Sequence, residues 1–279
     1  MKYATPTDFR RALVDKLTHQ ARREGVPVGR LQKYVAFERF LARLSREESE
    51  RWVLKGGYAL ELRLARYGRA TRDLDLNAPP PAESDMHDAL QRVAELDLGD
   101  YFTFTVGLPT SRSVLAGPPL GGYRFSVEAR VDGRRFDRFA LDVGQGDVTV
   151  RAPDRLPGRI DLTFAGLPPL EIPVYPLEDH FAEKLHAYTT PRERPTRVKD
   201  LVDLLLLIEL GLRPTHLLRR SIVATFERYA RHPLPDRLPE PPHAWRGSFE
   251  QLAEEAALST VNLGAAFAQL DAFYRDLEV

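Results

Sequence analysis

Two aspartates separated by one residue, Asp73 and Asp75, stand in the stretch DLDLNA (73–78). Alternation of polar and apolar residues with period two predicts a strand, in which residues i and i+2 project to the same face. Two like charges held there repel each other unless a cation or hydrogen-bond donors compensate, and carboxylate oxygens are the ligands that Mg²⁺ prefers. A solvated strand end has the same pattern, so the pair alone leaves a metal site and a plain strand both open.

Two glycines, Gly56 and Gly57, precede this strand in WVLKGG (52–57), which predicts a short strand running into a glycine turn. A helix is expected next, over 58–66. The first amides of a helix form an anion site, and glycine lets the backbone approach phosphates closely. An ordinary turn is the alternative. The order of strand, glycine pair, helix and second strand predicts a phosphate cradle beside the two aspartates.

Three residues farther along the chain could complete such a site. Asp142, on a strand, could bind a second metal or take the proton of an attacking hydroxyl, or it could cap a turn. Lys184 lies on an apolar helical stripe, where a lysine either extends to solvent or has a buried partner. Asp200 is in the first turn of a helix, a common place for an acidic residue.

The elements that must position these residues follow from periodicity and turn signals. Helices are predicted over 8–24, 29–44 and 84–97, and strands over 101–107, 123–131 and 134–144, the last two joined at Asp132-Gly133 as a hairpin. From about residue 176 the pattern is helical to the end. The fold class predicted is α/β (α+β), a mixed sheet with flanking helices, with domains at 1–176 and 177–279.

The stretch from Lys55 to Ala78 resembles the AbiEii/AbiGii toxin family of nucleotidyltransferases, the MenT-type toxins. In that family a KGG-x-A-L turn leads to R-x-T-x-D-x-D, and Ala59, Leu60, Arg69 and Thr71 fit this pattern beside the residues already named. Similarity continues through 139–147, 177–188 and 197–207. One departure is Tyr58, at the position where many nucleotidyltransferases carry a serine or threonine that contacts phosphate.

The resemblance implies a nucleotidyltransferase-like fold and an Mg²⁺-dependent enzyme that uses a nucleoside triphosphate (NTP) as co-substrate. It implies metal binding by Asp73, Asp75 and Asp142, with Lys184 and Asp200 in the catalytic site. Nucleotide contacts are implied for one further set: Lys55, Gly56, Gly57, Arg69 and Thr71. It also implies an RNA acceptor, the 3′ end of tRNA, whose modification would block translation, and a cognate antitoxin. The alternatives are transfer to a small molecule or protein hydroxyl, and an inactive NTP-binding module.

Composition limits the remaining classes of function. There is no cysteine, which excludes disulfides, thiolate zinc sites and cysteine nucleophiles. The longest dense apolar run, 204–208, is too short for a membrane span, and we expect a cytoplasmic protein. Net charge is zero, but residues 1–51 hold twelve Lys and Arg against seven Asp and Glu. This local excess of positive charge could attract a polyanion, or it could belong to helix faces exposed to solvent. His180, Glu183 and His186 are expected at the surface.

Overall fold

The computed structural model describes residues 1–48, 51–64, 71–79, 86–109, 119–191 and 197–277. They form two compact units, each built from segments that are not contiguous in the sequence. The first comprises Met1–Tyr58, Ala70–Gly146 and Arg155–Val174. The second comprises Ala59–Arg69, Asp147–Asp154 and Tyr175–Val279. None of the described helices is long and apolar enough to cross a membrane.

The first unit contains a seven-stranded mixed sheet in the order β3-β4-β5-β2-β1-β7-β6. The strands are β1 (Val53–Lys55), β2 (Asp73–Asn77), β3 (Phe102–Val106), β4 (Gly122–Val131), β5 (Arg134–Gly144), β6 (Asp154–Pro157) and β7 (Glu171–Val174). Strands β3, β4 and β5 form an antiparallel meander, whereas β2 is parallel to β5 and antiparallel to β1. The predicted mixed sheet is confirmed.

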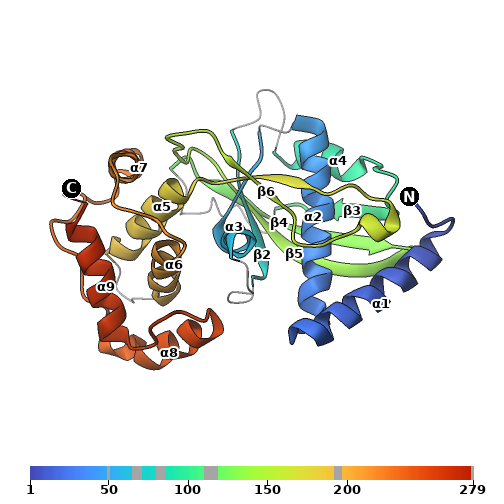
Figure 1. Cartoon of the computed structure of the whole chain (residues 1–279). Helices are drawn as coiled ribbons and strands as arrows, with labels where there is room; N and C mark the ends of the chain where they lie inside the picture. Colours follow the sequence, from blue (N-terminus) through green and yellow to red (C-terminus); the bar gives the residue numbers. More distant parts are fainter. Residues whose placement is uncertain (49–50, 65–70, 80–85, 110–118, 192–196, 278–279) are drawn as a thin grey trace. The chain divides into compact units, whose positions relative to one another are not determined.

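Helices cover one face of this sheet, and that face is apolar. The helices are α1 (Pro6–Glu24), α2 (Val28–Glu48) and α4 (Met86–Glu95), and α2 crosses the sheet over β5 (Figure 1). Strands β2, β3 and β4 bury every second residue beneath them, as Leu74 and Leu76 of β2 do. The alternate residues of β2 and β4 are polar, as is Asp142 of β5, and they lie on the opposite face. This arrangement decides which side chains remain available for binding.

The second unit is helical after residue 176, as predicted. It contains α5 (Leu177–Thr189), α6 (Val198–Glu209), α7 (His216–Tyr229), α8 (Arg246–Glu255) and α9 (Leu263–Arg275). Helix α6 is the centre of its core, since Leu201, Leu204 and Leu205 are almost completely buried. The last turns of α3 (Gly56–Arg63) join the same core through Leu60.

Two strands of the sheet were not predicted. No strand is expected after residue 144, yet β6 and β7 extend the sheet beyond β1. Both have only four residues and both contain a proline, Pro157 and Pro173, so neither carries a recognisable alternating pattern. Strand β7 pairs with β1 through Leu54 and Val174 and thereby supports the strand that leads to Gly56.

Candidate functional site

Strand β2 fixes the orientation of the two aspartates. Leu74 and Leu76 are completely buried, and a slip of one residue would expose both and bury the acidic residues instead. Asp73 and Asp75 therefore project together from the polar face, as the sequence predicts. Both are only partly buried.

Strand register places Asp75 and Asp142 side by side. Asp75 is the direct partner of Asp142 on β5 and of Lys55 on β1, and Asp142 is the direct partner of Arg124 on β4. Directly opposed residues share a face of the sheet. A charged row thus crosses four strands, with a cation at each end and two carboxylates between them: Arg124, Asp142, Asp75 and Lys55.

The glycine pair lies against this row. Gly56 begins α3 directly after β1 with φ +67°, a conformation that favours glycine, and a Cβ there would stand 2.0 Å from Asp75 Oδ2. A Cβ on Gly57 would stand 2.6 Å from Thr71 Oγ1. Thr71 Oγ1 is buried and has no hydrogen-bond partner within the described residues. The helix start with its two glycines and the Thr71 hydroxyl, called the cradle below, thus packs closely beside the carboxylates.

Tyr58 does not contribute to this cradle. Its ring is completely buried, and its hydroxyl donates a hydrogen bond of 2.6 Å to Glu38 Oε1 of α2. The backbone amides of Arg159 and Ile160 donate to the same carboxyl group. Burial raises the pKa of Glu38 to about 7, although these donors and nearby Arg39 oppose the shift. Tyr58 therefore anchors the start of α3 to α2, which explains why the expected phosphate-contacting hydroxyl is absent here.

Arg124 is a site residue that the sequence did not reveal. Its Nε and Nη2 atoms donate to Asp142 Oδ1 and Oδ2 at 2.7 and 2.6 Å, and Nη2 also lies 3.4 Å from Asp73 Oδ2. The hydrogen bond to Asp142, and then the charges of Asp142, Asp73 and Asp75, raise the pKa of Arg124 above its ordinary value despite some desolvation. Alternation along β4 put Arg124 on the polar face, but its partner depends on the exact strand register.

Lys184, Asp200 and Asp203 form an ion cluster within the second unit. Lys184 Nζ lies 2.7 Å from Asp203 Oδ2 and 3.3 Å from Asp200 Oδ1, and Arg197 also pairs with Asp200. Both aspartate side chains are almost completely buried. A lysine on an apolar stripe either extends to solvent or has a buried partner. Lys184 has buried partners, Asp200 and Asp203. Arg69, by contrast, lies outside the described residues.

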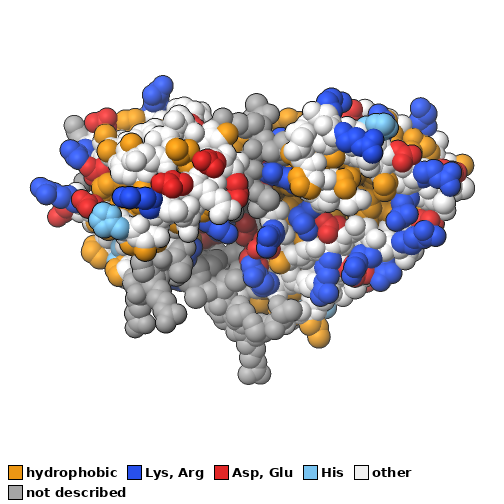
Figure 2. All heavy atoms as spheres, turned by 90° about the horizontal axis from the view of Figure 1, so that it is seen from below, with side chains coloured by type: hydrophobic (Ala, Val, Ile, Leu, Met, Phe, Trp, Pro, Cys, Tyr) orange, Lys and Arg blue, Asp and Glu red, His pale blue; other side chains and the backbone are white. Residues whose placement is uncertain are grey.

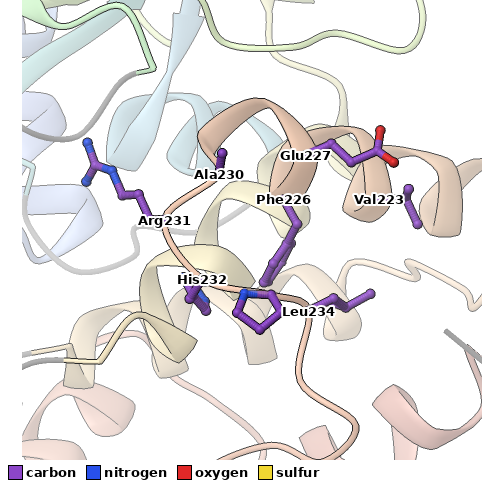
Figure 3. A pocket seen from close by; sticks show the side chains of 8 residues that line it. Val223, Phe226, Glu227, Ala230, Arg231, His232 and Leu234 are labelled. Carbon is purple, nitrogen blue, oxygen red and sulfur yellow. The ribbon is translucent and has the colours of Figure 1, made fainter.

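The expected surface position of the two α5 histidines is wrong. His180 and His186 are buried because α5 packs against both α6 and α7. The His186 ring lies tilted against that of His232, with 4.6 Å between the ring centroids. Burial, with the charges of His232 and Arg231, lowers the pKa of His186 to about 4. A pocket of about 610 Å³ adjoins His232 and is lined in part by Phe226 (Figure 3). The predicted site residues do not line it.

The acidic residues fit a hard divalent cation in part. Within the described ranges, no three Asp, Glu, His or Cys side chains are gathered so that they could hold a metal ion by themselves. Mg²⁺, however, is commonly bound by one or two carboxylates with water and substrate phosphates as the other ligands. Asp73 and Asp75 meet that requirement beside the cradle. Asp142 already accepts two hydrogen bonds from Arg124, and its role as a third ligand stays a prediction.

Comparison with known proteins identifies the fold and the family. Residues 39–273 match the sequence profile of a family described as nucleotidyl transferase AbiEii toxin, type IV TA system. MenT4, a nucleotidyltransferase toxin from Mycobacterium tuberculosis H37Rv, superimposes with a TM-score of 0.61 over 96% of this chain and 89% of its own, at 20% identity. This likeness confirms the predicted nucleotidyltransferase-like fold. JHP933 from Helicobacter pylori has 14% identity and a TM-score of 0.47 over 88% and 92% of the two chains. No curated protein matches the sequence.

Proposed function

The chain belongs to the AbiEii family of nucleotidyltransferase toxins, and on that premise we propose that it transfers a nucleoside monophosphate from an NTP to the 3′ end of tRNA. Such a modification would block translation. The observation that carries this proposal is the placement of Asp73 and Asp75 on one face of β2, directly against a helix start whose first residues have no side chain.

The cradle at Gly56 and Gly57 is suited to phosphate oxygens. Their backbone amides begin α3, where unpaired N–H groups and the helix dipole favour an anion. Thr71 Oγ1 is a buried hydroxyl that can donate to the same anion. In this proposal the cradle and Thr71 hold the β- and γ-phosphates, and Lys55, at the end of the charged row, adds positive charge.

Asp73 and Asp75 are proposed to hold Mg²⁺ together with the triphosphate. A bound cation would neutralise phosphate charge and align the α-phosphorus for in-line attack. The residues of the protein position the reactants and stabilise the charge that develops in the reaction. Pyrophosphate is the leaving group. Lys184 and Asp200 are proposed as further required residues, as the family resemblance implies. Asp142 either completes the metal site or assists the attacking hydroxyl.

The partners follow from the same proposal. The family description names a toxin–antitoxin system, which implies an antitoxin in addition to the NTP. An RNA acceptor is supported by the excess of Lys and Arg in residues 1–51, and basic side chains are spread over the face of the first unit seen in Figure 2. We expect the reaction to occur in the cytoplasm, where tRNA is available.

Periodate treatment of the acceptor tests this proposal. Periodate oxidises the terminal 2′,3′-diol of RNA and removes the 3′ hydroxyl without altering the rest of the molecule. Total tRNA, intact or oxidised, would be incubated with protein, Mg²⁺ and each α-labelled NTP. We expect label in intact tRNA and none in oxidised tRNA. Equal labelling of both samples would contradict the 3′ end as acceptor, and label in protein or small molecules alone would favour a different substrate.

A further inference from the structure

Arg124 lies among three carboxylates on the polar face of the sheet. Asp73, Asp75 and Asp142 are brought together by strand register, since Asp75 opposes Asp142 and Asp73 precedes Asp75 on the same face. Like charges on adjacent strand positions destabilise a sheet unless a counter-ion is near. The Arg124 guanidinium supplies that counter-ion, because it contacts Asp142 and Asp73 and is attracted by Asp75.

The two contacts of Arg124 differ in strength. Both oxygens of Asp142 accept short hydrogen bonds in the forked geometry that binds a carboxylate most firmly. The contact with Asp73 is a single one at 3.4 Å. The side chains of Arg124 and Asp73 are each 45% exposed, whereas that of Asp142 is only 13% exposed. Arg124 can therefore release Asp73 into solvent-accessible space while Asp142 keeps hold of the guanidinium.

We propose that Arg124 is an internal counter-ion of the carboxylate cluster and competes with a divalent cation for Asp73. A cation that binds Asp73 and Asp75 must approach oxygens already close to the guanidinium, and two positive charges at one carboxylate repel each other. Before a cation is bound, Asp142 holds Arg124 in place through both of its oxygens. The proposal rests on the metal site of the proposed function, but it concerns what the chain does before a cation is bound.

The competition has a consequence for free cation. Wild-type protein should bind a divalent cation weakly when no nucleotide is present, because the positive charge of Arg124 already neutralises part of the negative charge of the carboxylates. Removing the guanidinium should leave Asp73 and Asp75 without this counter-ion and increase their affinity for the cation. A supporting role for Arg124 in metal binding predicts the opposite change.

The test is a titration with Mn²⁺ in the absence of nucleotide, with free Mn²⁺ measured by electron paramagnetic resonance. We expect Arg124→Gln to bind Mn²⁺ about 10-fold more tightly than wild type, within the usual range for coupling between sites. Arg124→Lys, which keeps the charge without the fork, should show a smaller gain. Arg138→Gln is the matched control, because Arg138 is an exposed arginine on β5 that donates to the Ser126 hydroxyl instead of a carboxylate. Its removal should leave the affinity unchanged.

Unchanged or weaker Mn²⁺ binding by Arg124→Gln would overturn the proposal. An equal gain in Arg138→Gln would overturn it too, because it would indicate a general charge effect. Absence of binding in both wild type and Arg124→Gln would also overturn it. The variant Asp75→Asn distinguishes a failure of the counter-ion proposal from a failure of the proposed metal site. If Asp75→Asn leaves Mn²⁺ binding intact, the cation binds elsewhere and the proposed function loses its metal site. If Asp75→Asn abolishes binding but Arg124→Gln does not strengthen it, only the counter-ion is wrong.

Discussion

Gly56 and Asp75 lie so close that a single methyl group would collide with the carboxylate, since a Cβ on Gly56 would stand 2.0 Å from Asp75 Oδ2. The two residues are 19 positions apart and belong to neighbouring elements, the start of α3 and the middle of β2. Glycine at position 56 therefore serves the position of Asp75 as well as its own backbone, and the requirement can be tested without touching a charged group.

Gly56→Ala should inactivate the protein and destabilise it by more than backbone strain alone. Gly25 provides a matched control, because its φ of +65° is nearly that of Gly56 and a Cβ there would meet nothing within 4 Å. Gly25→Ala should cost about 1 kcal/mol of unfolding free energy and leave activity intact. Thermal unfolding and transfer of α-labelled nucleotide measure both effects. Equal stability and activity of the two variants would show that the close approach has no importance.

Thr71→Val should leave the nucleotide-free protein as stable as wild type, or slightly more stable, because Thr71 Oγ1 is buried without a hydrogen-bond partner in the described part of the chain. Nucleotide affinity should fall about 10-fold if the hydroxyl donates to phosphate. Thr225→Val is the control, since Thr225 Oγ1 on α7 is also buried and unpartnered among those residues. Binding of a fluorescent NTP analogue measures the difference. Equal affinity of all three proteins would remove Thr71 from the nucleotide site.

Lys184→Met should lower stability and abolish transfer, and the two effects should be separable. The substitution removes a cation 2.7 Å from the buried Asp203 carboxylate, at a cost of about 3 kcal/mol. Adding Asp203→Asn should restore much of the melting temperature without restoring transfer. Lys33→Met, which breaks a more exposed pair with Asp137, should be mild in both assays. Recovery of activity in the double variant would mean that Lys184 has a structural role alone.

Glu38→Gln should flatten the dependence of stability on pH. The pKa of Glu38 is raised from 4.5 to about 7, so the folded state favours the protonated carboxyl. The protonated Glu38 carboxyl therefore contributes to the free energy of unfolding below about pH 4.5, and this contribution is lost as pH rises through about 7. The difference in the free energy of unfolding is about 3 kcal/mol. Denaturant unfolding at several pH values measures it, with Glu47→Gln on the exposed side of the same helix as control. A parallel pH profile for Glu38→Gln and wild type would contradict the shift.

Much of the fold could be predicted because local patterns and tertiary packing agree. Strand β5 has the predicted limits, and the Asp132-Gly133 hairpin is confirmed by positive φ angles at both residues. The alternation of DLDLN also placed both aspartates on one face correctly. These patterns depend on residues adjacent in sequence, which is why they can be recognised from the sequence alone.

The partner of Arg124 could not be predicted for a specific physical reason. At the hairpin Val131 pairs with Arg134, and the same register continued along both strands would set Arg124 opposite Leu141. An irregularity between Ala129 and Arg130 shifts the register by one residue and sets Arg124 opposite Asp142 instead. A single extra residue in β5 thus creates the ion pair.

Other departures have a similar origin. The role of Tyr58 depends on Glu38, a residue 20 positions earlier on a helix that crosses the sheet. The two α5 histidines were expected at the surface because helical periodicity separates them, yet neighbours pack on several sides of that helix. In each case packing between distant segments, which the sequence pattern does not specify, decided the environment.

The most direct test of the proposed reaction compares two labels on the same NTP. Wild-type protein and Asp75→Asn would be incubated with Mg²⁺, total tRNA and NTP labelled at either the α- or the γ-phosphate. Nucleotidyl transfer predicts that wild type moves the α-label to RNA, releases the γ-label as pyrophosphate, and that Asp75→Asn moves neither. Transfer of the γ-label to RNA, or wild-type labelling by Asp75→Asn, would contradict it.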